Sequence, residues 1–145
     1  LIPTIGLGIN QEQYLIYDNC YFWHEEQDGN NNKGGQAIYG YIRNPIDETL
    51  LQEYQSSNVN FNNCIIDSQG YIPCIKFGNN TNNINLHVQV AFNNTYISGP
   101  IYCIDESTTS IRNVFDLMLN HCSDVEIHID DSENNNLYPP KIYYY

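Results

Sequence analysis

The chain has few positively charged residues: five lysines and arginines stand against 17 aspartates and glutamates, which gives a formal charge of −12. A surface this negative repels phosphate backbones and anionic lipid headgroups. We therefore expect no nucleic-acid partner, and we expect a basic protein to be a favourable one. Charged residues make up only 15% of the chain, so much of the surface must be polar without being charged.

Long apolar runs are also missing. No stretch approaches the roughly 20 apolar residues that span a bilayer, so we expect no membrane insertion. The sequence begins at Leu1 with neither a start methionine nor a signal peptide, which we interpret as a mature or trimmed product. A chain of 145 residues is expected to form a single domain, residues 1–145.

Motifs of common active sites are absent. No serine lies in a G-x-S-x-G elbow, and no glycine-rich loop with a lysine precedes a helix. His24 beside Glu25 and Glu26 could act as a base or bind a metal, but an acidic loop in solvent explains these residues more simply. His87 and His128 could share a metal only if their strands are neighbours. We therefore expect no enzyme activity, no cofactor and no metal site.

The cysteines show neither a CxxC pair nor zinc-finger spacing. They are well separated, which is typical of a secreted protein, and all five are disulfide candidates: Cys20, Cys64, Cys74, Cys103 and Cys122. Cys103 and Cys122 are close enough in sequence to be partners. Because five is an odd number, one cysteine is free, forms an intermolecular disulfide, or has its partner outside this sequence.

Two Asn-x-Thr sequons point to the same compartment. They begin at Asn79 and Asn93, and we predict glycosylation at both. Together with the cysteine pattern, they predict a secreted, extracellular protein.

Alternation of apolar and polar residues dominates the chain and predicts a mainly β protein. The clearest strand covers residues 84–92, whose even-numbered positions are apolar and form one face. Residues 124–130 repeat the pattern and place Val125, Ile127 and Ile129 inward. Weaker strands are predicted at 13–17, 20–24, 36–43, 59–66, 71–77 and 95–104.

Two helices are predicted among these strands. In residues 110–120 the apolar residues recur at helical spacing: Ile111, Val114, Phe115, Met118 and Leu119. A shorter helix is predicted at 46–54. Because strands dominate and no regular strand–helix alternation occurs, we predict an antiparallel β-sandwich with one amphipathic helix and a short second helix. We identify no internal repeat.

One series of segments resembles a known family. In order, these are a cysteine-ending strand at 59–64, an alternating strand at 86–90, a helical pattern at 112–119, and Cys122 directly before an alternating strand at 123–129. This order and spacing resemble the poxvirus secreted immune-evasion domains, which include the viral CC-chemokine inhibitor and the SECRET domain of viral tumour-necrosis-factor receptors. Residues 5–9 followed by Cys20 are similar to that family's first strand and first cysteine.

The resemblance implies a compact β-sandwich that sequesters host chemokines or cytokines through an acidic sheet face and an acidic loop after the first cysteine. The loop corresponds to residues 25–28 of this chain, and the predicted strand at 124–130 presents further acids outward. The residues predicted to bind ligand are Glu25, Glu26, Asp28, Asp124, Glu126 and Asp130.

Two functions follow as expectations. The first is a secreted acidic glycoprotein that binds a basic extracellular host protein, a chemokine or cytokine, and blocks its receptor engagement. The alternative is a structural or adhesive subunit of an extracellular coat or filament, with strand edges that self-assemble. The odd cysteine and the tyrosine-rich C-terminal residues favour this alternative.

Overall fold

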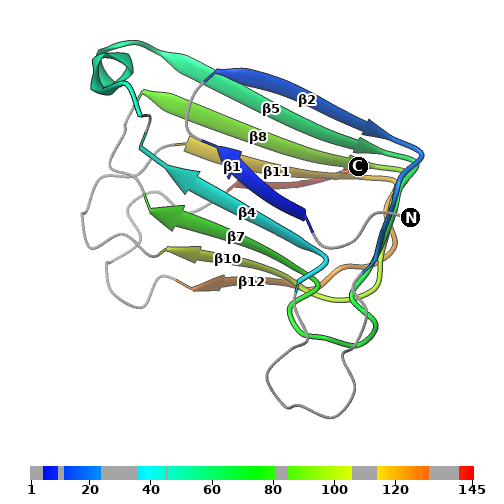
Figure 1. Ribbon diagram of the computed structural model, residues 1–145. Coiled ribbons are helices and arrows are strands. Elements are labelled where there is room, and N and C mark those ends of the chain that lie inside the picture. Colours follow the sequence, from blue (N-terminus) through cyan, green and yellow to red (C-terminus); the bar gives the residue numbers. More distant parts are fainter. Residues whose placement is uncertain are drawn as a thin grey trace.

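The computed structural model describes residues 5–9, 12–23, 36–44, 46–80, 85–105, 114–130 and 141–145. Its strands form three sheets (Figure 1). Sheet I contains, in spatial order, β1 (Ile5–Ile9), β4 (Ile38–Arg43), β7 (Ile75–Asn80), β10 (Ile101–Asp105) and β12 (Ile127–Asp130). Sheet II contains β2 (Gln13–Asp18), β5 (Gln55–Asn62), β8 (Leu86–Asn93), β11 (Val114–Asn120) and β13 (Lys141–Tyr144). Sheet III contains β3 (Tyr21–Trp23), β6 (Ile65–Asp67) and β9 (Tyr96–Ile97).

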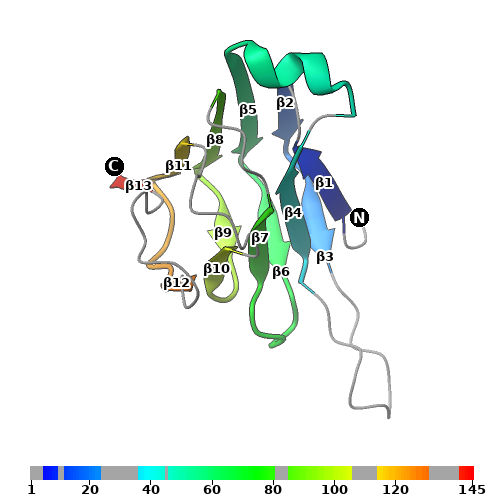
Figure 2. The same cartoon turned by 90° about the vertical axis from the view of Figure 1, so that its left-hand side faces the viewer.

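The chain visits the three sheets in a fixed order, and each circuit stacks on the one before it (Figures 1 and 2). We call each circuit a coil. Coils 1, 2 and 3 each contain one strand of each sheet: β1, β2 and β3 in coil 1, β4, β5 and β6 in coil 2, and β7, β8 and β9 in coil 3. Coil 4 contains β10, β11 and residues 122–126, and coil 5 contains β12 and β13. Successive coils run in the same direction, so every strand pair is parallel. The fold is a parallel β-helix, a solenoid of stacked coils.

The predicted antiparallel β-sandwich is therefore wrong, and so is the sandwich that the poxvirus resemblance implies. Alternation of apolar and polar residues shows which face of a strand is buried, but it does not show the direction or identity of the neighbouring strand. The faces themselves were predicted correctly on β8, where Leu86, Val88, Val90 and Phe92 are buried.

The two predicted helices are wrong as well. Within residues 110–120, the described part is the strand β11, and residues 110–113 lie outside the described residues. The second helix is reduced to η1, a short 3-10 segment at Glu48–Gln52. The described residues contain no α-helix, and none of their helical segments has the length and apolar character to cross a membrane.

Apolar residues of successive coils form rows inside the solenoid. One such row follows sheet II through Leu15, Val59, Val90, Leu117 and Ile142. In the next inward row, the rings of Tyr17 and Phe61 stack at 5.1 Å between centroids, and those of Phe61 and Phe92 at 4.9 Å. These rows provide the hydrophobic stabilisation of the fold, because each side chain covers the equivalent one in the next coil.

The turn that follows the sheet II strand recurs in coils 1 to 4, so the expectation of no internal repeat is wrong. The repeated segments are Tyr17–Cys20, Phe61–Cys64, Phe92–Thr95 and Leu119–Cys122. Their third residues have a positive φ, between 46° and 54°. Asparagine tolerates this left-handed conformation better than most residues, and it occupies the position in three of the four turns.

The second residues of these turns form a hydrogen-bonded column that we call the Asn ladder. Asn62 Nδ2 donates to Asp18 Oδ1 at 2.8 Å, and Asn93 Nδ2 donates to Asn62 Oδ1 at 2.7 Å. Asn120 Nδ2 donates in turn to Asn93 Oδ1. Side-chain amides stacked in this way stabilise parallel, in-register strands.

The fourth residues form a second column, of two thiols and a hydroxyl, in coils 2 to 4. Each donates to a backbone carbonyl of the preceding coil: Cys64 Sγ to Tyr17 O at 3.3 Å, Thr95 Oγ1 to Phe61 O at 3.2 Å, and Cys122 Sγ to Phe92 O at 3.2 Å. Threonine can replace cysteine in this column because its hydroxyl makes the same hydrogen bond.

Candidate functional site

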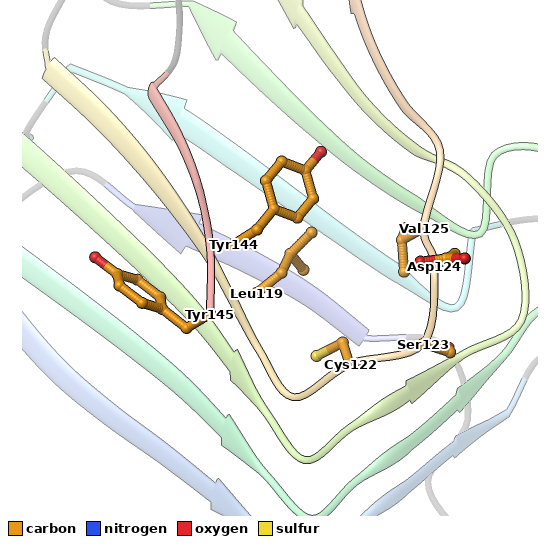
Figure 3. A pocket seen from close by; sticks show the side chains of 7 residues that line it. All are labelled: Leu119, Cys122, Ser123, Asp124, Val125, Tyr144 and Tyr145. Carbon is orange, nitrogen blue, oxygen red and sulfur yellow. The ribbon is translucent and has the colours of Figure 1, made fainter.

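A cleft opens at the coil 5 end of the solenoid. Its volume is about 330 Å³, and it lies between residues 122–125 of coil 4 and the end of β13. Figure 3 shows Tyr144 and Leu119 on one side of the cleft and Asp124 and Val125 on the other. The cleft is large enough to hold one long side chain of a ligand.

Backbone hydrogen bonds hold the tyrosine wall of the cleft in place. Tyr145 N donates to Leu119 O at 3.0 Å, and His121 N donates to Tyr145 O at 2.9 Å. The rings of Tyr143 and Tyr145 are nearly parallel, with centroids 6.4 Å apart. Tyr144 and Tyr145 are 65% and 66% exposed, so this wall offers rigid aromatic surface to a ligand.

Asp124 supplies the acid of the cleft. It lines the cavity and is exposed to solvent. Glu126 follows two residues later and is also exposed, and its Oε1 lies 2.6 Å from Nε2 of His128. The structure thus brings two of the six predicted ligand-binding acids to one end of the molecule.

The other four predicted acids have no described side chain. Asp130 ends β12, but the structure does not describe its side chain. Glu25, Glu26 and Asp28 lie outside the described residues, as does His24. The predicted strand at 124–130 begins only at Ile127, and Ile129 is 40% exposed rather than buried.

All five cysteines are free thiols, so none of the predicted disulfides is present in the structure. Cys122 lines the cleft, and Cys64 and Cys122 belong to the hydrogen-bonded column. Burial raises the pKa of both thiols, and it raises the pKa of Cys103 to about 12. Thiols with raised pKa values hold their protons at neutral pH and are poor nucleophiles.

The two predicted glycosylation sites lie on strands β7 and β8. The side chain of Asn79 is not described. Asn93 is a member of the Asn ladder, and its Nδ2 already donates to Asn62. The sequon hydroxyl, Thr95 Oγ1, is buried and shares its one hydrogen between the backbone carbonyls of Phe61 and Asn93. Asn93 therefore has a structural role, and glycosylation at either site stays a prediction.

The two described histidines of the metal hypothesis lie on different sheets. His87 is on β8 of sheet II and His128 is on β12 of sheet I. The shared metal site required these two strands to be neighbours, and they are not. No group of three metal-ligating side chains occurs among the described residues. His87 instead contacts Tyr54 and Asp116.

The tyrosines of the cleft were not predicted as site residues. The repeated turn motif aligns Leu119 with Phe92, but it has no copy in coil 5, so it does not indicate that β13 pairs with β11. Comparison of the chain with protein-family models, with curated proteins and with solved structures found no match in any of the three.

Proposed function

We propose that the protein is a binding module that captures a basic segment of an extracellular partner protein in the cleft at the coil 5 end. The observation that carries the proposal is the position of Asp124 in the wall of a cleft that is also lined by aromatic and apolar side chains, among them Leu119 and Tyr144. A lysine or arginine side chain has the matching chemistry, since its aliphatic stem packs on apolar surface while its charged head reaches a carboxylate.

Charge supports the same kind of partner. The net charge of −12 attracts basic proteins over long range and speeds their encounter with the molecule. The two exposed tyrosines and Val125 then supply the contact area that excludes water. Because the sandwich implied by the poxvirus resemblance is absent, the proposal specifies a basic protein segment and does not single out chemokines or cytokines.

The test is to measure the binding of short lysine- or arginine-containing peptides to the purified protein by isothermal titration calorimetry. Asp124→Asn is expected to weaken binding at least about tenfold, because a charge-assisted hydrogen bond is lost. Glu53→Gln is the matched control: it removes the same charge from an exposed residue that does not line the cleft. Equal affinity of the two variants would reject the cleft as the binding site.

The structure also favours a second candidate, the self-assembling subunit. β1 and β2 are edge strands at one end of the solenoid, and β12 and β13 are edge strands at the other. Tyr14 on β2 is 67% exposed and Ile16 is 49% exposed. Edge strands that pair with no further strand in the described part of the chain can pair between molecules. Light scattering coupled to size exclusion distinguishes the candidates, because a monomer at high concentration argues against the subunit.

A further inference from the structure

Three polar side chains form a hydrogen-bonded chain on the outer face of sheet II. Tyr54 lies just before β5, His87 is on β8, and Asp116 is on β11. The Tyr54 hydroxyl is 3.2 Å from His87 Nδ1, and His87 Nε2 is 2.9 Å from Asp116 Oδ2. None of the three lines the cleft at the coil 5 end.

The contacts determine which nitrogen of His87 carries the proton. Asp116 can only accept when it is ionised, so the neutral imidazole donates through Nε2. Nδ1 then has a lone pair and accepts the proton of the Tyr54 hydroxyl. The side chain of Asp116 is only 15% exposed, and its second oxygen has no hydrogen-bond partner among the described residues. Its one side-chain hydrogen bond therefore orients the ring of His87.

This order of groups is that of an activated nucleophile: a hydroxyl, a base that takes its proton, and a carboxylate that orients the base. We propose that Tyr54 is a nucleophile toward activated acyl groups, with His87 as its base and Asp116 as a positioning residue. The phenol is accessible, because Tyr54 is 68% exposed.

The acyl-transfer step is balanced as follows. Tyr54 Oη attacks the acyl carbon of an activated ester, and a new ester bond forms. The bond from that carbon to the leaving group breaks, and the leaving group departs with the electron pair. The phenol proton passes to His87 Nδ1, where the imidazolium is stabilised by Asp116. The product is an acylated Tyr54.

The experiment uses p-nitrophenyl acetate as the acyl donor and locates the acetyl groups by peptide mass spectrometry. Tyr14 is a matched internal control, since it is 67% exposed and lies on the same sheet. We expect acetylation of Tyr54 to be at least about a hundredfold faster than that of Tyr14, the lower end of the range for general-base assistance. Equal rates at the two tyrosines would overturn the proposal.

Four variants separate base assistance by His87 from the effect of solvent exposure. Tyr54→Phe should abolish acetylation at position 54 and leave the rate of Tyr14 acetylation unchanged. His87→Gln should lower the Tyr54 rate to that of Tyr14, because no imidazole remains to accept the phenol proton. Asp116→Asn should lower the Tyr54 rate and Asp116→Glu should restore part of it. A Tyr54 rate that is unaffected by His87→Gln would reject the assigned base.

Discussion

At the scale of single residues, Asn93 shows how one side chain connects two coils. Its amide nitrogen donates to Asn62 and its carbonyl oxygen accepts from Asn120. An asparagine carries a donor and an acceptor on one short side chain, so each asparagine of the ladder can form hydrogen bonds with both the coil before it and the coil after it.

Replacement of Asn93 by leucine should destabilise the protein. The substitution leaves Asn62 Oδ1 without its donor and Asn120 Nδ2 without its acceptor, which should lower the free energy of unfolding by about 1–3 kcal/mol. Asn58→Leu is the control, because Asn58 also lies on sheet II but makes only a 3.5 Å contact with Ser56. Urea unfolding measures both variants, and equal losses would show that the ladder adds nothing.

Because Cys103 is buried, the free energy of unfolding should depend on pH in the alkaline range. Its thiol has a pKa of about 12 in the folded protein against an ordinary value of 9.0, because it is buried. Between these values the unfolded chain binds fewer protons, so the free energy of unfolding should fall as pH rises, by up to about 1.4 kcal/mol per pH unit. Below the lower value this contribution to stability is fully present.

Urea midpoints of wild type and Cys103→Ala at about pH 8 and about pH 10.5 test this prediction. The variant should be less stable at the lower pH, because a buried side chain is truncated, but its stability should fall less between the two conditions. Parallel pH dependence in the two proteins would show that Cys103 is not the group responsible.

At the scale of elements, β11 shows why a helix was predicted where a strand exists. Its apolar residues fit both periods: Phe115, Met118 and Leu119 fit a helical face, whereas Phe115, Leu117 and Leu119 fit one face of a strand. In the structure Leu117 is fully buried and Met118 is not. Parallel pairing with β8 and β13 decides between the two periods, because neighbouring strands override local propensity.

Two alanine substitutions distinguish the strand from the helix. On the strand, Leu117→Ala should lower the free energy of unfolding by about 2–5 kcal/mol, because a fully buried leucine is lost. Met118→Ala should cost clearly less, since this side chain lies on the outer face. The predicted helix requires the opposite order, because Met118 lies on its apolar face and Leu117 does not. Thermal and urea unfolding of the two variants measure the difference.

Local patterns in the sequence predicted much of the strand content but little of the architecture. Strands were expected near most of their observed positions, and the buried face of β8 was correct, because alternation is a property of adjacent residues. The partner of each strand depends on residues far apart in the chain, such as Asn62 and Asn93. The repeated turn motif carried that information, but its copies at 17, 61, 92 and 119 are unevenly spaced, and so no fixed period marks them.

The candidate site was predictable only in part. Asp124 and Glu126 were identified from their place on an alternating segment, and both are exposed at the coil 5 end. Tyr144, which lies across the cleft from Asp124, ends β13, and Tyr145 follows it; the positions of both depend on how coil 5 stacks on coil 4. The orientation of His87 toward Asp116 likewise depends on the pairing of β8 with β11.

At the scale of the whole molecule, each coil contacts only its neighbours, so stability should vary along the solenoid axis. β5 and β8 are paired on both sides, whereas β2 and β13 are paired on one side only. We expect backbone amides of β5 and β8 to exchange with solvent most slowly and those of the two end strands most rapidly.

Hydrogen exchange followed by mass spectrometry measures this gradient. Addition of a denaturant well below the unfolding midpoint should enlarge the difference, because the end coils open before the central ones. Uniform protection along sheet II would contradict the expectation and would indicate that all five coils unfold as one cooperative unit.

The Asn ladder has a direction. Each side-chain amide donates to the preceding coil, toward coil 1. Asp18, in coil 1, only accepts a hydrogen bond in this column. Asn120, in coil 4, has a buried Oδ1 without a hydrogen-bond partner among the described residues. An internal coil therefore presents a donor on one side and an acceptor on the other. Duplication of such a coil inserts a unit that fits both of its new neighbours, whereas duplication of the first coil places an aspartate where a donor is required. The ladder therefore keeps all its amides paired when a middle coil is duplicated, whereas duplication of the coil that carries Asp18 places two acceptors face to face.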